Sequence, residues 1–419
     1  MKFKLTKDEK NWILYDVGNS AFTLLITTIM PIYFNSLAGS AGVSETDYLA
    51  YWGYAASLVT LIVALVGPMF GAIADNKGFK KPIFTIVLGV GAVGCIALGF
   101  AKHWLAFLII LIIAKIGYSG SLIFYDSMLP DVTTEERADR VSSAGYAWGY
   151  IGSCIPFVLS LVLVLGGSSF GIRMDTAMFL AFVITAVWWV GMTIPLLLHY
   201  KQKYYVEKAE HAIGDAFKRL GRTFMNIGKE RKVFLFLLAF FFYIDGVYTI
   251  IDMAVAYGEA LGLGSTGLLL ALLVTQIVAF PFAILFGRLA QKYATDKLIT
   301  VCITAYLAIA VFAIFLTNQV QFWILAVLVG MFQGGIQALS RSYFAKIIPP
   351  SQSGEYFGLY DICGKGAAFM GTTLVGLVSQ LTGSINKGIS VLSVIFIVGL
   401  VLFRLAVATG GPEKEEEAH

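Results

Sequence analysis

Long apolar runs, separated by short polar connections, make up most of the chain. Each run has at least the roughly 20 residues that an α-helix needs to cross a bilayer. Their ranges are 12–38, 46–74, 82–101, 104–129, 141–166, 174–199, 232–262, 265–290, 297–317, 320–347, 356–382 and 385–408. The pattern therefore predicts an all-α integral membrane protein with twelve transmembrane helices.

Composition and charge support this class. The chain is 58% hydrophobic and 13% charged, with a mean hydropathy of +0.80, whereas a soluble domain carries about 25% charge. The net charge of +4 comes from Lys and Arg in the connections between the runs. This distribution is typical of topology signals and not of a nucleic-acid surface, so we expect a lipid bilayer environment and no nucleic-acid partner.

The positions of Lys and Arg also predict an orientation. With the N-terminus inside, only Lys102, Arg173 and Lys387 fall on the outer side. We therefore expect both termini in the cytoplasm, in a multi-pass protein of the plasma (inner) membrane of a bacterium. The first run is full length and has no small-residue cleavage site, so we interpret it as a retained helix and not a signal peptide.

Two patterns recur about half a chain apart. The segment FGAIA at 70–74 is followed by Lys81, and FGRLA at 286–290 is followed by Lys297 in the same way, 216 residues later. A second set repeats with identical spacing 219 residues later: Pro130, Glu136, Gly145 and Gly152, then Pro349, Glu355, Gly364 and Gly371. Such glycines let helices approach closely in lipid. The repeats predict two pseudo-symmetric six-helix bundles.

The longest connection sets the domain boundaries. It covers 200–231, is basic, and divides the helices six and six. We predict an N-terminal bundle at 1–199, a cytoplasmic linker at 200–231, a C-terminal bundle at 232–409 and an acidic cytoplasmic tail at 410–419. Within the linker, 206–220 fits either a short amphipathic helix on the membrane surface or a solvated tether.

The loop between the second and third helices resembles the signature of the major facilitator superfamily. The matching residues are Gly71, Asp75, Gly78, Lys80 and Lys81, and position 79 holds Phe where a basic residue is usual. The resemblance implies the major facilitator fold and a gating role for this loop. In that role Asp75 accepts hydrogen bonds from the amides that begin the eleventh helix and stabilises an inward-closed state.

The second copy of the loop differs in charge. Asp75 and Gly78 are replaced there by Gln291 and Ala294. The two halves are therefore expected to share the arrangement of their helices but not the charged residues of this loop. A narrower resemblance covers 11–22, 242–250, 334–342 and 355–360, which are similar to the superfamily branch that includes the autophagy-related vacuolar amino-acid effluxers. It implies solute efflux and favours an amino acid or small peptide as substrate.

The fourth helix places an ionisable group near the bilayer midplane. Lys115 shares a helical face with Tyr118 and Asp126, and charged residues at this depth are usually functional. The segment 115–120 also resembles the facilitator helix-4 motif, whose basic residue faces the central cavity. We interpret Lys115 as a substrate or coupling residue; the alternative is a structural partner for a carboxylate.

The seventh helix carries an acidic stripe. Asp245, Asp252 and Glu259 recur at spacings of seven, which returns to nearly the same face, and Tyr248 lies beside them. Asp245 is at a depth similar to Lys115, so a cavity with both charges suits a zwitterionic solute. We predict that Asp245 binds and releases a proton; the alternative is an ion pair with Lys115 or another helix that only holds the halves together.

Two further carboxylates are assigned to gating. Asp16 lies near the cytoplasmic end of the first helix. Asp126 is predicted to pair with a lysine of the signature loop, namely Lys77, Lys80 or Lys81.

The tenth and eleventh helices add the last polar candidates. Gln337 is a candidate cavity contact, and Arg341 lies four residues later on the same face. Asp361 and Lys365 form an i,i+4 pair that neutralises itself. We therefore interpret Arg341, Asp361 and Lys365 as mainly structural or gating residues.

These observations favour a secondary active transporter that moves a small solute by alternating access, with proton-coupled efflux. A lipid flippase or amphiphilic drug exporter of the same fold is the alternative, and a lateral opening between helices 5 and 8 or 2 and 11 would favour it. An enzyme or a non-transporting receptor is a remote alternative, because the four histidines lie at helix ends or in loops. The chain has no Walker phosphate loop, and we expect no cofactor, no metal and a monomer.

Overall fold

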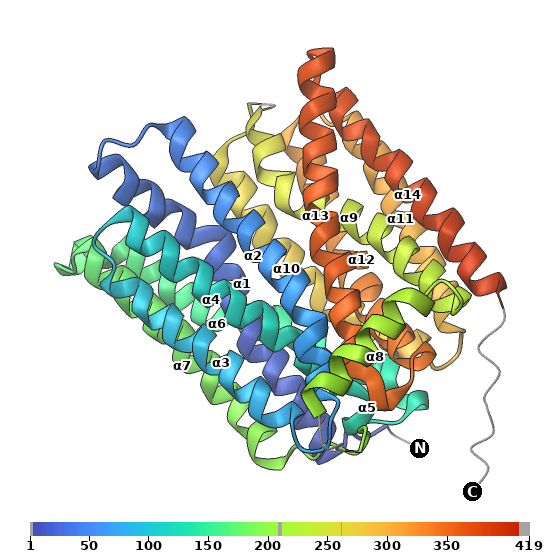
Figure 1. Cartoon of the computed structure of the whole chain (residues 1–419). Helices are drawn as coiled ribbons and strands as arrows, with labels where there is room; N and C mark the ends of the chain where they lie inside the picture. The colour runs from blue at the N-terminus through green and yellow to red at the C-terminus, as the bar shows by residue number, and fades with distance from the viewer. Residues whose placement is uncertain (1–2, 208–211, 261, 410–419) are drawn as a thin grey trace, which may run out of the picture.

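The computed structural model describes residues 3–207, 212–260 and 262–409, and the described chain is mostly helical (Figure 1). Twelve of its helices are long and apolar enough to cross a membrane. They are α1 (Lys7–Ser40), α2 (Glu45–Ala74), α3 (Lys80–Ala97), α4 (Trp104–Ser127), α6 (Glu135–Gly166), α7 (Met174–His199), α9 (Arg231–Ala260), α10 (Ser265–Leu289), α11 (Thr295–Ile314), α12 (Gln319–Ile347), α13 (Ser353–Thr382) and α14 (Ile385–Ala408). The predicted fold class is confirmed.

Some helices begin before the apolar run that predicts them. α6 begins at Glu135 and α13 at Ser353, ahead of the predicted starts at 141 and 356. Both helices carry acidic residues in the first turn, where carboxylates interact favourably with the exposed N–H groups. Polar first turns therefore extend these helices beyond their apolar segments. The short helix α5 (Leu129–Val132) is not predicted by the runs.

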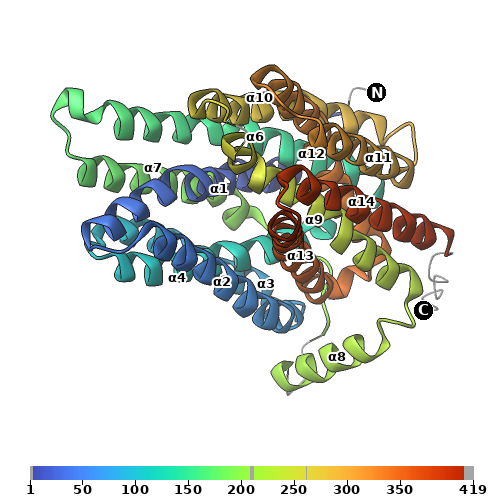
Figure 2. The same cartoon turned by 90° about the horizontal axis from the view of Figure 1, so that it is seen from above.

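The described part of the linker contains a helix, α8 (Ala212–Asn226). Its Ala216 and Leu220 pack against Ala72 of α2. Figure 2 shows α8 at the edge of the molecule, outside the group of spanning helices. The linker therefore contains a helix, but it covers 212–226 and not the expected 206–220. The predicted acidic tail at 410–419 lies outside the described residues.

The spanning helices form two groups, α1 to α7 and α9 to α14, which stand side by side (Figure 1). Between the groups, α2 packs against α13, and α6 packs against α10 and α12. The short helices α5 and α8 and the first turns of α1 lie at one end of the bundle, which we call the linker end.

The repeated glycines lie where helices touch. A Cβ atom added to Gly152 of α6 would lie 2.5 Å from Val17 of α1, and one added to Gly371 of α13 would lie 2.6 Å from the Asp245 carboxylate of α9. Both distances are far below a normal contact, so glycine is needed at each position. Val17 in one half therefore occupies the place that Asp245 occupies in the other.

A second repeated contact was not predicted from the sequence. The Tyr15 hydroxyl lies 2.6 Å from the Ser121 hydroxyl, and the Tyr243 hydroxyl lies 2.7 Å from the Ser340 hydroxyl. The first pair joins α1 to α4 and the second joins α9 to α12. Ser121 and Ser340 are 219 positions apart, the same offset as the glycine repeat, so this contact is part of the same internal symmetry.

Candidate functional site

Polar side chains from both halves meet in a group that we call the central cluster. It consists of Lys115 and Tyr118 from α4, Tyr248 and Asp252 from α9, and Asp361 and Lys365 from α13. The Lys115 ammonium interacts electrostatically with Asp252 and with Lys365, and Tyr248 interacts with Asp361 and Tyr118. The cluster therefore lies between α4 of the first half and α9 and α13 of the second half.

The members of the central cluster keep accessible surface. The Asp252 side chain is exposed, and Lys115, Tyr118 and Tyr248 are half-buried. The Tyr118 hydroxyl lies 2.5 Å from the hydroxyl of Thr23, an exposed residue of α1. An exposed carboxylate among the helices of both halves is able to bind a solute without first breaking an internal contact.

The Asp361–Lys365 pair is formed as the sequence predicts. The Lys365 ammonium lies 2.5 Å from the Asp361 carboxylate, and both side chains are largely buried. Because the pair neutralises itself, the charges in the central cluster that are left for a solute are those of Lys115 and Asp252. These two groups attract each other, but no ion pair within 4.0 Å joins them among the described residues.

The alternative interpretation of Asp245, an ion pair with Lys115 or another helix, is not found among the described residues. Asp245 is fully buried, and its Oδ1 accepts hydrogen bonds from the Gly371 amide at 2.9 Å and from Thr249 at 3.4 Å. Its Oδ2 has no hydrogen-bond partner among the described residues. The carboxylate that interacts electrostatically with Lys115 is Asp252, about two turns further along α9. The side chain of Glu259 lies outside the described part.

Arg341 of α12 crosses between the halves at the linker end. Its buried guanidinium donates to the Asp126 carboxylate at 3.0 Å, to the Asp16 carboxylate at 3.2 Å, and to the hydroxyl and carbonyl oxygens of Ser142 at 2.9 and 3.1 Å. It also lies 4.3 Å from the centre of the Tyr146 ring, close enough for a cation–π contact. One cation of the second half is thus held by two carboxylates of the first half.

This arrangement corrects the predicted partner of Asp126. The signature-loop lysines do not reach Asp126: Lys77 pairs with Glu207, and Lys80 pairs with Asp75 and Asp131. Lys81 has no ion pair among the described residues. Lys80 reaches the carbonyl oxygen of the neighbouring Ser127, while the Asp126 carboxylate is held by Arg341.

Asp75 makes the contact that the signature implies. Its two carboxylate oxygens accept hydrogen bonds from the Gly354 and Glu355 amides, at 2.8 and 2.9 Å, at the start of α13. The contact needs a close approach of α2 and α13, because a Cβ atom at Gly71 would lie 2.2 Å from the Gly354 carbonyl oxygen. Burial raises the pKa of Asp75 to about 7, against the opposing effects of Lys80 and the two amides.

Lys80 completes the contact between α2 and α13. Its buried ammonium lies 3.8 Å from Asp75 and donates to the Ser353 hydroxyl at 2.9 Å and to the Ser127 carbonyl oxygen at 3.2 Å. Gly78 has a positive φ of 78°, which only glycine adopts readily, and it turns the loop so that Lys80 points inward. We call this set of contacts the α2–α13 interface.

The second interface joins α6 to α10, α11 and α12. Asp139 of α6 accepts hydrogen bonds from Thr295, Ser342 and Lys346, at 2.7, 2.6 and 2.5 Å. Arg140 donates to Gln291 at 2.8 Å. We call these contacts the α6–α10 interface.

Several residues of these interfaces were not singled out from the sequence. Asp139 lies in a predicted connection, and Lys346 lies at the end of a predicted helix. Charged residues are common at both kinds of position. Arg219 of α8 donates to Glu355 at 3.0 Å and to the Ala72 carbonyl oxygen at 2.6 Å, and the sequence singled out Glu355 only through the repeat and the family resemblance. Gln337 is half-buried one turn before Arg341.

The comparisons with known proteins agree with this architecture. A family model described as "Vacuole effluxer Atg22 like" matches residues 6–415. The chain belongs to this family. The MFS-type transporter YxiO of Bacillus subtilis is 44% identical over 96% of this chain and 95% of that protein. Autophagy-related protein 22 of Cryptococcus neoformans is 28% identical over 70% of this chain and 54% of that protein.

Solved structures of low sequence identity share the fold. The transporter FucP in the outward conformation has a TM-score of 0.75 at 14% identity, covering 95% of this chain and 98% of that one. The human organic anion transporter MFSD10 has a TM-score of 0.74 at 14% identity, covering 96% and 100%. This Atg22-like chain is therefore a multi-pass transporter of the major facilitator superfamily and not an enzyme, as the sequence predicts.

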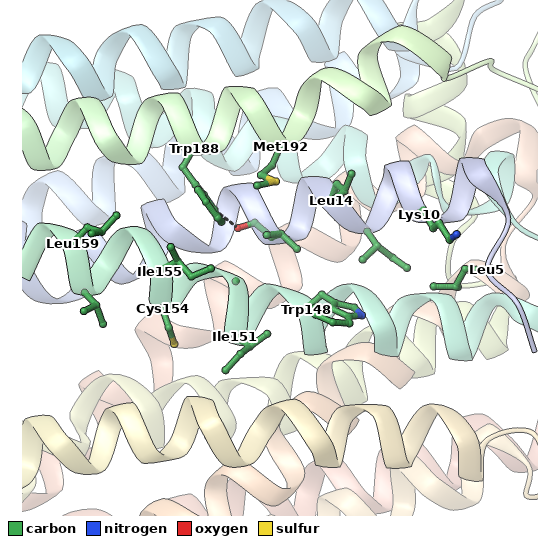
Figure 3. A pocket seen from close by; sticks show the side chains of 14 residues that line it. Leu5, Lys10, Leu14, Trp148, Ile151, Cys154, Ile155, Leu159, Trp188 and Met192 are labelled. Carbon is green, nitrogen blue, oxygen red and sulfur yellow. Dashed lines mark hydrogen bonds between the residues drawn. The ribbon is translucent and has the colours of Figure 1, made fainter.

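A large groove lies away from the central cluster. It is an apolar groove of about 1020 Å³ on the outside of the first half, where α1, α6 and α7 meet (Figure 3). Its lining includes Trp148, Ile155 and Trp188 but no member of the central cluster. Size alone therefore does not identify the transport site, and we place it at the cluster because of the charges and the contacts between halves.

Proposed function

We propose that this Atg22-like transporter exports a small zwitterionic solute, of amino-acid type, by alternating access. The main support for this proposal is the position of Lys115 and Asp252 on opposite halves. Both side chains have accessible surface, and no ion pair joins them among the described residues. A solute carboxylate is attracted by Lys115 and a solute ammonium by Asp252. Such a solute bridges the halves, so its binding energy favours the arrangement in which the halves close around it.

The contacts between the halves support a state closed at the linker end. Three groups of hydrogen bonds and ion pairs join α1–α7 to α9–α14 at or near that end. They involve the Arg341 network, the α2–α13 interface and the α6–α10 interface. With the linker end in the cytoplasm, as the Lys and Arg distribution predicts, this is an inward-closed state. Transport then requires these contacts to break.

The same packing argues against a lateral lipid path at this end. α2 and α13 touch through Gly71 and Gly354, and a Cβ atom at Gly287 of α10 would lie 2.7 Å from Ser143 of α6. These are the two places where a flippase of this fold is expected to open. The small-solute proposal is therefore preferred to the lipid flippase.

Asp245 is the proposed proton carrier. Its place in the first half is taken by the apolar Val17, so the packing of the helices does not need a carboxylate there. An ionised carboxylate with one unpartnered oxygen is expensive in a buried site, and a proton on Oδ2 removes that charge. The Asp245 carboxyl sits on the helix that carries Asp252, so its protonation is positioned to influence the solute site two turns away.

The test is amino-acid flux in proteoliposomes that contain the purified full chain. We expect Lys115→Gln and Asp252→Asn each to abolish uptake of the transported amino acids, while Asp175→Asn, an exposed carboxylate outside the cluster, keeps wild-type flux. Absence of flux over a panel of all twenty amino acids and dipeptides, with a folded wild-type protein, would refute the substrate class.

Proton coupling is tested separately with Asp245→Asn and Asp245→Val, the residue that the other half uses. Both variants are expected to lose transport driven by a pH gradient and to retain solute exchange without a gradient. Undiminished gradient-driven transport in either variant rules out Asp245 as the proton carrier and leaves the solute site intact.

A further inference from the structure

The apolar groove of the first half has the position and shape of a lipid site. It runs along α1 between α6 and α7 (Figure 3), and at its edge the Trp148 ring lies 5.3 Å from the Phe280 ring of α10 in the second half. Trp148, Ile155 and Leu159 of the groove are exposed, so this apolar surface is not covered by the protein. In a membrane-spanning chain an exposed apolar groove is filled by lipid chains, because water is excluded there.

The groove is long enough for an acyl chain. Its lining begins near Leu5 and Lys10 at the linker end and reaches Leu159 along α6. From Trp148 to Leu159 alone the helix advances by about 16 Å at 1.5 Å per residue, and one leaflet of a hydrocarbon core of about 30 Å is about 15 Å thick. An acyl chain that starts at the linker end therefore fits within the length of the groove.

The mouth of the groove carries positive charge. Lys10 is the one charged residue of the lining, its side chain is exposed, and it has no ion pair among the described residues. Lys7, one turn earlier, lies 2.8 Å from the His199 ring at the end of α7. The nearest acidic neighbour on α1, Glu9, is buried and paired with Arg137.

Two of the other polar groups in the groove already have partners. The Trp188 indole N–H donates to the Val17 carbonyl oxygen at 3.1 Å (Figure 3), and the Cys154 thiol donates to the Tyr150 carbonyl oxygen. The lining is otherwise apolar apart from the Trp148 indole N–H, and its one charged side chain is at the mouth. An occupant that fits has an apolar tail and an anionic head.

We propose that this groove binds an anionic phospholipid, with one acyl chain between α6 and α7 and the headgroup phosphate at Lys10. This site is separate from the central cluster, so the proposal does not depend on the transported solute. A bound lipid fills the space between α6 and α7 and holds both helices against α1.

The experiment is native mass spectrometry of the full chain in detergent, with equal amounts of dioleoyl phosphatidylglycerol and dioleoyl phosphatidylcholine. The wild type is expected to retain phosphatidylglycerol preferentially. Lys10→Gln should lower the ratio of retained phosphatidylglycerol to phosphatidylcholine by about fivefold, the factor that corresponds to one lysine at an anionic lipid surface. Lys102→Gln, an exposed lysine at the other end of the bundle, is the matched control and should leave the ratio unchanged.

The apolar part of the site is tested by filling it. Ile155→Trp places a large ring in the groove and should reduce retention of both lipids, whereas Leu165→Trp, at an exposed position of α6 outside the lining, should not. Val158→Trp replaces Ile155→Trp if the latter does not fold. Equal retention of the two lipids by the wild type, an unchanged ratio in Lys10→Gln, or wild-type retention in the folded groove variant would each overturn the proposal.

Discussion

The two interfaces at the linker end occupy related places in the two halves, but they are built from different chemistry. At the α2–α13 interface, Asp75 is fully buried and accepts hydrogen bonds from two backbone amides. At the α6–α10 interface, the corresponding Gln291 is exposed and accepts a hydrogen bond from the Arg140 side chain. The internal repeat has therefore preserved the approach of the helices and not the groups that join them.

The difference predicts unequal sensitivity. Backbone amides at the start of α13 have fixed positions, so only an acceptor at Asp75 satisfies both of them. At the α6–α10 interface, long side chains such as Lys346 and Arg140 are able to move to water when a partner is lost. The first interface should therefore control the closed state more strongly than the second.

The largest effect is expected for Asp75→Ala. This change leaves the Gly354 and Glu355 amides without an acceptor and removes one partner of the buried Lys80. Two unsatisfied buried donors destabilise the closed contact by about 3 kcal/mol. Hydrogen exchange of residues 353–357 in nanodiscs should then be faster by about two orders of magnitude. Asp75→Asn keeps an acceptor oxygen and serves as the conservative control, with a smaller effect. Equal protection in wild type and Asp75→Ala would contradict the assignment.

A smaller effect is expected for Asp139→Asn. The amide oxygen of Asn still accepts one hydrogen bond, from Thr295 or Ser342, but the attraction to Lys346 is lost. Because the Lys346 side chain is partly exposed, it is rehydrated, and we expect a loss of about 2 kcal/mol. Hydrogen exchange of residues 342–347 should increase while that of 353–357 stays near the wild-type rate. A larger effect on 353–357 than on 342–347 would show that the two interfaces do not act separately.

The pH dependence distinguishes the interfaces further, because Asp75 titrates and Gln291 does not. Burial raises the pKa of Asp75 to about 7 in the closed state, above the ordinary value of about 3.9. Protonated Asp75 therefore stabilises the closed contact. This stabilisation is fully present when the pH is below the ordinary pKa of the group and is lost as the pH rises through 7. Between pH 6 and 7 the closed contact should weaken by about 1 kcal/mol.

This is measured as the exchange rate of residues 353–357 after correction for the intrinsic pH dependence of exchange. The reference is Asp75→Asn, which has no titrating group at this position and should show a flat profile. A wild-type profile that is equally flat, or that shows tighter closure at higher pH, would refute the stated sign.

The sequence predicts which helices form these interfaces better than it predicts which side chains pair across them. The apolar runs place the spanning helices, and the signature loop predicts the contact from Asp75 to the start of α13. The partner of Asp126 is wrongly predicted, because the sequence does not show that Arg341 of the tenth spanning helix reaches two carboxylates of the first half. The alternative of an ion pair between Asp245 and Lys115 is not found either: depth along a helix is readable from the sequence, but the sequence does not show that the Gly371 amide of α13 donates to Asp245.

The smallest effect is expected for Gln291→Ala, the change at the position that corresponds to Asp75. Gln291 is exposed, and its only hydrogen-bond donor in the described structure is Arg140, whose guanidinium also lies 3.9 Å from the Phe3 ring. Water replaces the lost acceptor, so we expect a change within about 0.5 kcal/mol. Exchange of both 342–347 and 353–357 should match the wild type. An effect as large as that of Asp75→Ala would contradict this difference between the two copies of the loop. A neutral side-chain contact at an exposed rim would then stabilise the closed state as much as a buried carboxylate at a helix N-terminus does.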